Sequence, residues 1–347
     1  MQTITLDADG LALLERHARW WQRKGSLFAT VQSEPLGDLW LPLSDGTLAS
    51  TDLDLRPEML DVDRLAGPLQ APGALEVRGD LFRTADPYGR VPWVEAILGT
   101  PIRATIQGGS MRTMAFVSSW QEWEQSAVHR DEAWFNLLVR LTDLLALRSG
   151  GRFAVVQPTM RGPSDLAEAV LGPELMSFSL YDHPESLQRF LQQATGVFVE
   201  ILHELLAHIP PVEGGYVSPF GIWAPGTVVR TQCDATAFLS AAHYAQWFLP
   251  CDVQICESVD YSIIHLHSCS LHTVDALLSV ERPQAIQVTL ETSPPGPTLE
   301  EMLPIFRRVL RSKPLLLSGK LSEDEVRWLQ AQLPPDGLAI TARQTEW

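Results

Sequence analysis

The chain alternates between short apolar runs and helical patterns with capped starts, from about Gly151 to its C-terminus. The apolar runs have the length of buried β-strands, and the helical patterns begin with residue types that cap helices. This alternation is typical of consecutive βαβ units, in which parallel strands form one sheet and helices cover it. It predicts an α/β fold with a parallel sheet.

Six runs in this region are predicted to be strands: Phe153–Pro158, Gly215–Phe220, Tyr261–His267, Ala285–Glu291, Pro314–Ser318 and Gly337–Thr341. Leu27–Gln32 and Pro101–Gln107 are candidates for two more. Eight such strands predict a (β/α)8 TIM-type barrel. A doubly wound open sheet is the alternative fold, but the sequence contains neither GxGxxG nor GxxxxGK[ST].

Three helices have clear sequence signals. Apolar residues recur at spacings of three and four from Leu187 to Leu205, which is the pattern of an amphipathic helix. Thr298 with Glu301, and Ser322 with Glu325, each form the pattern of a capping box at a helix start. Each box follows a predicted strand, as a βαβ succession requires.

Residues 1 to about 100 differ from the rest of the chain. A first helix is predicted from Leu11 to Lys24, and Pro, Gly and Asp then interrupt short apolar pieces. We find neither a long linker nor an internal repeat. Residues 1–347 are therefore expected to form a single barrel domain, with residues 1–100 as an elaborated, irregular N-terminal extension.

Charge limits the partners that this chain can have. Its 347 residues include 42 acidic and 26 basic side chains, which gives a formal net charge of −16. Such a protein repels phosphate backbones and anionic lipid surfaces, so we expect no nucleic-acid or membrane partner.

The N-terminal residues and the cysteines bear on localisation. The first 25 residues lack the basic and apolar segments of a secretory signal. The most apolar long segment, Val197 to Ile209, is too short and too polar to span a bilayer. The four cysteines form neither a CxxC pair nor a dense disulfide framework. A reduced, cytoplasmic protein is expected.

The segment from Glu257 to His272 has the richest chemistry. Alternation along a strand places Ile263, His265 and His267 on one face and Leu266 on the other. In a barrel the apolar outer face meets the helices, so both histidines should point inward near the carboxyl end of their strand. Active sites of barrel enzymes lie at that end.

His265, His267 and Cys269 are spaced by two, so their side chains can converge on one Zn²⁺. The alternative is structural: hydrogen-bonded interior histidines beside a buried free thiol. A histidine that acts without metal, as an acid, a base or an anion anchor, agrees with either arrangement.

Other polar residues follow predicted strands or loops. Asp234 precedes a predicted helix start at Ser240. Its carboxylate is either a functional group of the site or the cap of a turn. Glu291 closes a predicted strand at the barrel mouth. Arg161 lies in a Gly/Pro loop and either clamps a carboxylate or is simply exposed. Trp223 is a pocket wall or a packing residue.

Several segments resemble the uroporphyrinogen decarboxylase superfamily, which includes corrinoid-dependent methyltransferases. FAVVQPTMRGPSDLAEAVLG is similar to its strand, loop and helix, and LYDHPESLQRFLQQATGVFVEIL and RTQCDATAFLSAAHYAQWFLP are similar to two of its helices. SIIHLHSCSLHTVDALL is similar to the segment in which methyltransferase members carry a His-x-Cys zinc pair. The resemblance covers about the last two-thirds of the chain and implies a barrel fold.

The chain also departs from this family. It lacks the Arg-Gln-Ala-Gly-Arg type of loop found in the porphyrinogen decarboxylases, which disfavours a role in heme synthesis. His267 stands where the second zinc ligand would be cysteine, unless the pair is His267 with Cys269. No cysteine follows Cys269 to supply the remote third thiolate.

Three functions remain open at this stage. The resemblance implies methyl or one-carbon transfer linked to a corrinoid, with Zn²⁺ holding a thiol acceptor. Without any cofactor, proton transfer and charge stabilisation would support decarboxylation of a small carboxylated substrate. A non-catalytic barrel that binds a small molecule or a corrinoid protein is the third. The pocket is expected to contain His265, His267, Asp234 and Glu257 or Glu291, with Tyr216 or Trp223 as walls.

Overall fold

The computed structural model describes residues 3–32, 37–66, 76–125, 130–291 and 296–344, which pack as two compact units. The first unit comprises the described residues of Pro35–Ala74 and Ala85–Pro210. The second comprises those of Gln2–Glu34, Leu75–Thr84 and Pro211–Trp347. The single domain expected for residues 1–347, with an extension up to residue 100, stays a prediction.

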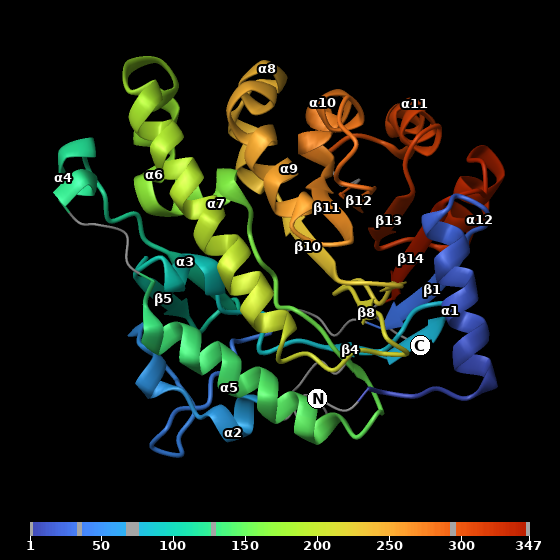
Figure 1. The fold of residues 1–347 in the computed structure, drawn as a ribbon, viewed down its shortest axis with the longest axis horizontal. Coiled ribbons are helices and arrows are strands. Elements are labelled where there is room, and N and C mark those ends of the chain that lie inside the picture. The colour runs from blue at the N-terminus through green and yellow to red at the C-terminus, as the bar shows by residue number, and fades with distance from the viewer. Residues whose placement is uncertain (1–2, 33–36, 67–75, 126–129, 292–295, 345–347) are drawn as a thin grey trace. The chain divides into compact units, whose positions relative to one another are not determined.

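A seven-stranded sheet forms the centre of the second unit (Figure 1). Its first six strands are parallel, and the last one is antiparallel to its neighbour. In spatial order they are β10 (Val228–Gln232), β11 (Tyr261–His267), β12 (Ala285–Leu290), β13 (Leu315–Gly319), β14 (Leu338–Gln344), β1 (Leu27–Gln32) and β3 (Glu76–Gly79). The predicted parallel order of residues 261–267, 285–291 and 314–318 is confirmed.

Helices lie along the outer side of these strands in Figure 1. The helices of this unit are α1 (Ala8–Trp21), α8 (Ala241–His243), the π-helical turn η3 (Tyr244–Phe248), α9 (Leu249–Glu257), α10 (Val274–Leu278), α11 (Leu299–Leu310) and α12 (Glu323–Gln332). Two 3-10 helices, η2 (Asp234–Phe238) and η4 (Ser268–Thr273), follow β10 and β11. A small hairpin contains β8 (Tyr216–Val217) and β9 (Trp223–Ala224). Both predicted capping boxes are present, at Thr298 and Ser322.

The first unit is mainly helical. Its helices are η1 (Pro57–Met59), α2 (Val62–Leu65), α3 (Trp93–Ile97), α4 (Trp120–Gln125), α5 (Glu132–Ser149), α6 (Pro163–Asp182) and α7 (Pro184–Leu206). Its antiparallel sheet contains β2 (Leu53–Leu55), β5 (Ile102–Thr105) and β6 (Ser110–Thr113). The chain returns to this unit within the two-residue strand β4 (Thr84–Ala85), and β7 (Ala154–Val155) is equally short.

Three of the eight predicted barrel strands are corrected. Pro101–Gln107 contains β5, but this strand is antiparallel to β6, because Gly108 and Gly109 adopt positive φ and reverse the chain at once. Phe153–Pro158 and Gly215–Phe220 contain only the two-residue strands β7 and β8. The α/β class is confirmed, and the described residues show a parallel sheet of six strands rather than a closed barrel of eight.

An apolar cluster lies on one face of the large sheet, on the same face as the two histidines of β11. It contains Trp20, Leu27, Ala29, Leu81, Ile222, Ile263, Ala285, Leu316 and Ala339. Ile263 is the member from β11, so His265 and His267 follow it on the same face at steps of two residues. The cluster is therefore the floor of any site that these histidines form.

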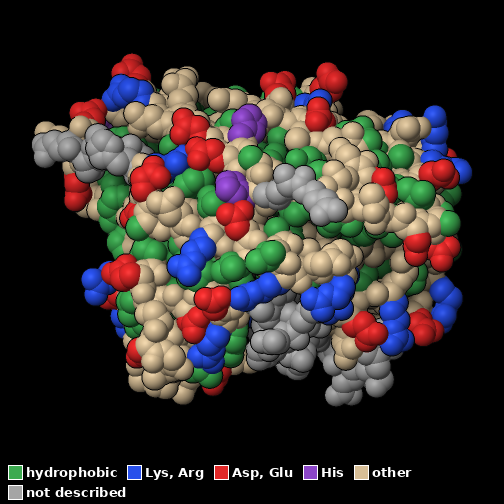
Figure 2. All heavy atoms as spheres, turned by 60° about the horizontal axis from the view of Figure 1, so that its bottom comes forward, with side chains coloured by type: hydrophobic (Ala, Val, Ile, Leu, Met, Phe, Trp, Pro, Cys, Tyr) green, Lys and Arg blue, Asp and Glu red, His purple; other side chains and the backbone are tan. Residues whose placement is uncertain are grey.

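Surface charge is mixed on the face shown in Figure 2, where acidic and basic side chains are interspersed. Among the described residues on that face, the basic side chains form no continuous strip of the kind that tracks a phosphate backbone. Among the described helices, none is both long enough and apolar enough to cross a membrane.

Candidate functional site

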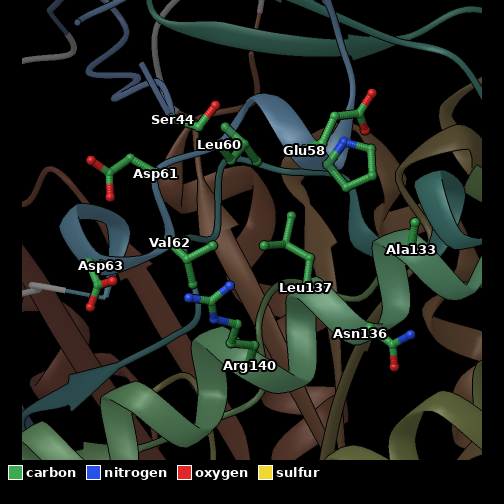
Figure 3. Close-up of a pocket in the computed structure, with 11 residues that line it drawn as sticks. Ser44, Glu58, Leu60, Asp61, Val62, Asp63, Ala133, Asn136, Leu137 and Arg140 are labelled. Atoms are coloured by element: carbon green, nitrogen blue, oxygen red, sulfur yellow. The ribbon is translucent and has the colours of Figure 1, made fainter. Parts of the chain in front are cut away.

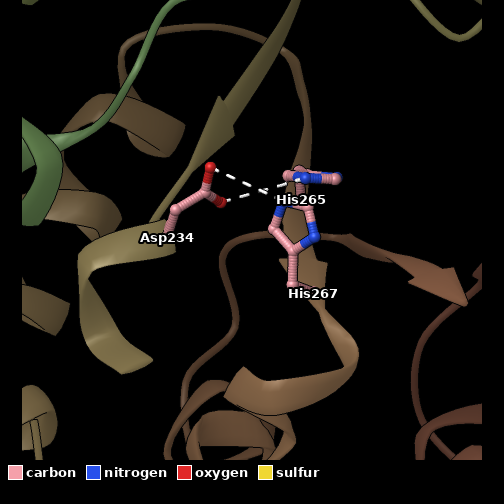
Figure 4. A group of neighbouring side chains, drawn as sticks. All are labelled: Asp234, His265 and His267. Atoms are coloured by element: carbon pink, nitrogen blue, oxygen red, sulfur yellow. Dashed lines mark ion pairs between the residues drawn. The ribbon is translucent and has the colours of Figure 1, made fainter. Parts of the chain in front are cut away.

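Two neighbouring strands place an aspartate and two histidines together at their carboxyl ends. Gln232, the last residue of β10, is paired in register with His265 of β11. Asp234 lies two residues after Gln232, at the start of η2. His267 lies two residues after His265, at the end of β11. Figure 4 shows the three side chains pointing toward one another.

The three side chains are close enough to share one bound ion. Nε2 of His265 lies 3.9 Å from Oδ1 of Asp234, and Nε2 of His267 lies 3.6 Å from Oδ2 (Figure 4). One ligand atom from each residue can be chosen so that all three lie within 4.8 Å of one another. This is the one such group of three or more potential ligands that the described residues contain.

Gln287 fixes the orientation of His265. Its amide nitrogen donates to Oγ1 of Thr289 at 3.2 Å, so its amide oxygen is the atom that accepts from Nδ1 of His265. Nε2 of His265 then carries a lone pair that faces Asp234. Burial, together with the positive charge of Arg230, lowers the pKa of His265 to about 3, so the ring is neutral at pH 7.

His267 has the opposite electrostatic environment. The interaction with the nearby carboxylate of Asp234 outweighs burial and, with the charge of Glu291, raises the pKa of His267 to about 9. Its Nδ1 lies 2.9 Å from Oε1 of Glu291. Burial opposes ionisation of Asp234, but the close His267 cation and the charge of Arg230 lower its pKa overall. The two histidines therefore differ in charge at neutral pH.

A row of polar side chains on β10 holds Asp234 in place. Arg230 donates to the amide oxygen of Gln232, and Nε2 of Gln232 donates to Oδ2 of Asp234 at 2.7 Å. Oδ1 of Asp234 is buried and has no hydrogen-bond partner among the described residues. A buried carboxylate oxygen without a donor is rare in native proteins and usually marks a place for a ligand, an ion or water.

These residues suit a divalent metal ion. Two imidazole nitrogens and one carboxylate oxygen form a common ligand set for zinc and for other transition metals. Each histidine also has its Nδ1 bound to an oxygen of a neighbouring side chain, Gln287 or Glu291, as metal-ligating histidines almost always do. The orphaned oxygen of Asp234 is the third donor, so the arrangement fits such an ion.

The sequence placed Asp234 in the same pocket as the two histidines and made Cys269 the third metal ligand. In the structure, Asp234 is the third residue of the cluster. The strand ends at His267 and the 3-10 helix η4 begins at Ser268, so the two-residue alternation stops before Cys269. Cys269 is exposed, and its Sγ lies 3.9 Å from Oγ of Ser270. Among the described residues it does not belong to the group that could share an ion.

The other predicted site residues occupy different places. Glu291 joins the cluster through His267. Glu257 is exposed at the end of α9, just before β11 begins, and thus lies at the opposite end of that strand from His267. Arg161 belongs to the first unit, where its Nε lies 2.9 Å from Oε1 of the buried Glu95.

Tyr216 and Trp223 form part of the hairpin of β8 and β9. The indole Nε1 of Trp223 donates to the carbonyl oxygen of Val212 at 2.8 Å, and its backbone N–H donates to Nδ1 of His17 at 2.7 Å. These contacts give Trp223 a packing role in the hairpin rather than a place in the wall of the histidine cluster.

Sequence reasoning missed Phe220, Arg230, Gln232 and Gln287. The Phe220 ring centroid lies 6.4 Å from that of His265, and the Arg230 guanidinium carbon lies 5.6 Å from the Phe220 ring centroid. A signal was present in the strands VVRTQ and AIQVTL, where buried polar residues interrupt apolar runs. A buried polar side chain needs a partner, so such interruptions indicate a polar interior.

Each unit also contains a hollow. The hollow of the first unit is about 570 Å³ in volume and lies between the segment of η1 and α2 and the helix α5 (Figure 3). Its lining mixes acidic residues with Arg140, and one of them, Asp63, is paired with Arg148 at 2.7 Å. A second cavity, of about 230 Å³, lies within the second unit, and Phe220 is among its lining residues.

Comparison with known proteins yields a similarity of fold. No protein-family model matches the sequence, and no curated protein matches it. Among solved structures, the chain is similar to a methyltransferase from Methanosarcina mazei, with a TM-score of 0.55 and 12% sequence identity. The match covers 76% of this chain and 75% of the methyltransferase. At this identity the similarity shows a shared α/β fold.

Proposed function

We propose that this protein is an enzyme that transfers a methyl or other one-carbon group to a thiol acceptor with the help of zinc. In this proposal the sheet belongs to a (β/α) barrel of the uroporphyrinogen decarboxylase type. The observation that carries it is the cluster of Asp234, His265 and His267, whose potential ligand atoms lie within 4.8 Å of one another. The fold shared with a methyltransferase and the sequence resemblance support the choice of reaction.

Asp234, His265 and His267 would hold the zinc ion. A zinc ion with three protein ligands has a further position for a substrate thiol, and it lowers the pKa of a thiol that binds there. Gln287 keeps the Nε2 lone pair of His265 directed at the site, and Glu291 orients His267. The methyl donor in this proposal is a corrinoid, bound to a partner protein, as the resemblance implies.

A cofactor-free decarboxylation is the second candidate, and one specific observation favours it. His267 is held as a cation by Asp234 and Glu291, beside the neutral His265. A fixed positive charge stabilises the carbanion-like product of a decarboxylation, and in this candidate function His267, whose Nε2 faces Asp234, would supply the proton. This function needs no metal.

Zinc binding separates the two candidates. Competition with a chromophoric chelator should show one zinc ion per wild-type chain, and His265→Ala, His267→Ala and Asp234→Ala should each lose this binding. Glu257→Gln is the matched control, because this exposed carboxylate lies at the other end of β11.

The reaction is tested with methylcobalamin and a small thiol, following the absorbance change of the corrinoid. Zinc-dependent demethylation that disappears in the same three variants supports methyl transfer. A wild-type protein that binds no zinc would contradict the proposal and leave decarboxylation as the better candidate.

A further inference from the structure

The cavity of about 230 Å³ in the second unit has a predominantly apolar wall. Its apolar lining includes Val31, Val77, Leu81, Phe82, Phe220 and Leu316. The volume is below the range of pockets that hold drug-sized ligands. The cavity therefore suits a small molecule with an apolar body.

The charge of the lining selects the kind of ligand. Among the described residues that line this cavity, Arg343 is the one charged residue, although acidic residues outnumber basic ones in the whole chain by 42 to 26. Arg343 has no ion-pair partner in the described part of the chain. Although the residue is exposed, the protein around its guanidinium partly desolvates it and lowers its pKa.

Two hydroxyl groups accompany this arginine. Ser318 of β13 and Thr341 of β14 are paired in register, and Arg343 follows Thr341 by two residues on the same face of β14. Ser318 and Thr341 are both buried and both line the cavity, and neither hydroxyl has a hydrogen-bond partner within the described ranges. Both hydroxyls are thus free to donate to an anion in the cavity, on the same face of the sheet as the Arg343 guanidinium.

The cavity lies next to the histidine cluster. Phe220 lines the cavity, and its ring centroid is 6.4 Å from that of His265. Leu316 and Ser318 of the cavity are paired in register with Gln287 and Thr289, the two residues that orient His265. A ligand in the cavity would thus lie one strand away from the residues that hold the histidine.

We infer that this cavity binds a small carboxylic acid, with its carboxylate on Arg343, Ser318 and Thr341 and its apolar body against Val31, Val77 and Leu316. A guanidinium fork matches the two oxygens of a carboxylate, and charge-assisted hydrogen bonds are the stronger kind. The inference rests on the proposed function for its place in a reaction. It deepens that function by assigning a carboxylate group to the small thiol acceptor. Binding itself can be measured without any turnover.

Isothermal titration calorimetry with butanoate tests this site, and butanamide serves as the uncharged probe of the same shape. Wild-type protein should bind butanoate at least tenfold more tightly than butanamide. Arg343→Gln should abolish this preference, and Thr341→Val should weaken butanoate binding severalfold. Arg112→Gln is the control, because it removes the same charge from an exposed position in the first unit and should leave binding unchanged.

The outcomes separate this inference from the proposed function. Loss of butanoate binding in Arg343→Gln, with zinc binding intact, supports the carboxylate site. Butanoate binding that depends on Arg343 in a protein that binds no zinc would uphold the inference while the methyl-transfer proposal fails. Equal binding of butanoate and butanamide, no binding of either probe, or unchanged butanoate binding in Arg343→Gln would overturn the inference.

Discussion

The side-chain oxygen of Gln287 accepts a hydrogen bond from Nδ1 of His265, and this contact decides which nitrogen of the histidine faces Asp234. The two residues are partners in register on adjacent parallel strands, so the sheet itself holds them in place. Removing the acceptor would let the ring turn or change tautomer. Gln287 is therefore a positioning residue for the cluster.

Gln287→Leu should weaken zinc binding by about 10- to 100-fold, which is the usual effect of removing the partner of a ligating histidine. Gln287→Glu keeps an acceptor at the same place and should retain zinc binding. Chelator competition measures both affinities, and thermal melting shows whether each variant folds. Zinc affinity in Gln287→Leu equal to that of wild type would contradict this role for Gln287.

Substitutions on one face of β11 should mainly lower stability, and substitutions on the other face should mainly remove zinc binding. Leu266 is 1% exposed and faces away from the histidines, so Leu266→Ala should lower the free energy of unfolding by about 2 to 5 kcal/mol. The folded fraction of this variant should still bind zinc normally. Urea unfolding, followed by zinc titration under native conditions, tests both statements.

His267→Ala is the complementary variant. Its side chain is 30% exposed, so solvent screens its interactions with Asp234 and Glu291, and its loss should change the free energy of unfolding by only about 1 kcal/mol. Zinc binding should be lost. A variant that unfolds as readily as Leu266→Ala and keeps its zinc would show that His267 is a structural residue.

The net charge of −16 leads to a third prediction. Binding to duplex DNA depends on neutralising phosphates with basic side chains, and this chain has an excess of acidic ones. Micromolar protein should cause no mobility shift of duplex DNA at physiological salt. A shift that weakens as salt is added would contradict the expectation.

The parts of the fold that the sequence predicted best are those with local signals. The capping boxes at Thr298 and Ser322 and the apolar strands β12 and β13 are encoded by neighbouring residues, and all are present. Strand β10 was missed because Arg230 and Gln232 interrupt its apolar pattern. Both polar residues are buried inside the unit. Buried parallel strands are normally recognised as nearly continuous apolar runs, and β10 does not have such a run.

The candidate site was predictable only in part for a similar reason. Alternation along β11 was enough to place His265 and His267 on one face. Asp234 was expected in the same pocket, but its distances to the two histidines depend on the register between β10 and β11, which no local pattern encodes. The position of Cys269 depends on the residue at which the strand ends, and strand ends are poorly specified by sequence.

A buried carboxyl group outside the site gives the last prediction. Asp252 is fully buried, and its Oδ2 accepts a hydrogen bond from the hydroxyl of Tyr244 at 2.9 Å. Its Oδ1 has no hydrogen-bond partner in the described part of the chain. Burial raises the pKa of Asp252 from its ordinary value of 3.8 to about 7.

The sign of the effect on stability follows from proton binding. Between about pH 4 and pH 7 the native state keeps this proton while the unfolded state has released it, so the unfolded state binds fewer protons and stability falls as pH rises. Across this pH window, ionisation linked to Asp252 lowers the free energy of unfolding by a total on the order of 4 kcal/mol. Asp252→Asn keeps an acceptor for Tyr244 and cannot ionise. It should therefore be more stable than wild type above pH 7, and its stability should fall less between pH 4 and pH 7.

Urea unfolding at a series of pH values measures this effect as the difference between wild type and Asp252→Asn, so the contributions of other carboxylates cancel. Asp45→Asn is the control, because hydrogen bonds from Thr47 lower the pKa of this exposed carboxyl and its removal cannot produce the same change. Parallel stability curves for wild type and Asp252→Asn would mean that Asp252 is ionised in the native state throughout. In that case the buried carboxylate must have a stabilising partner other than the Tyr244 hydroxyl.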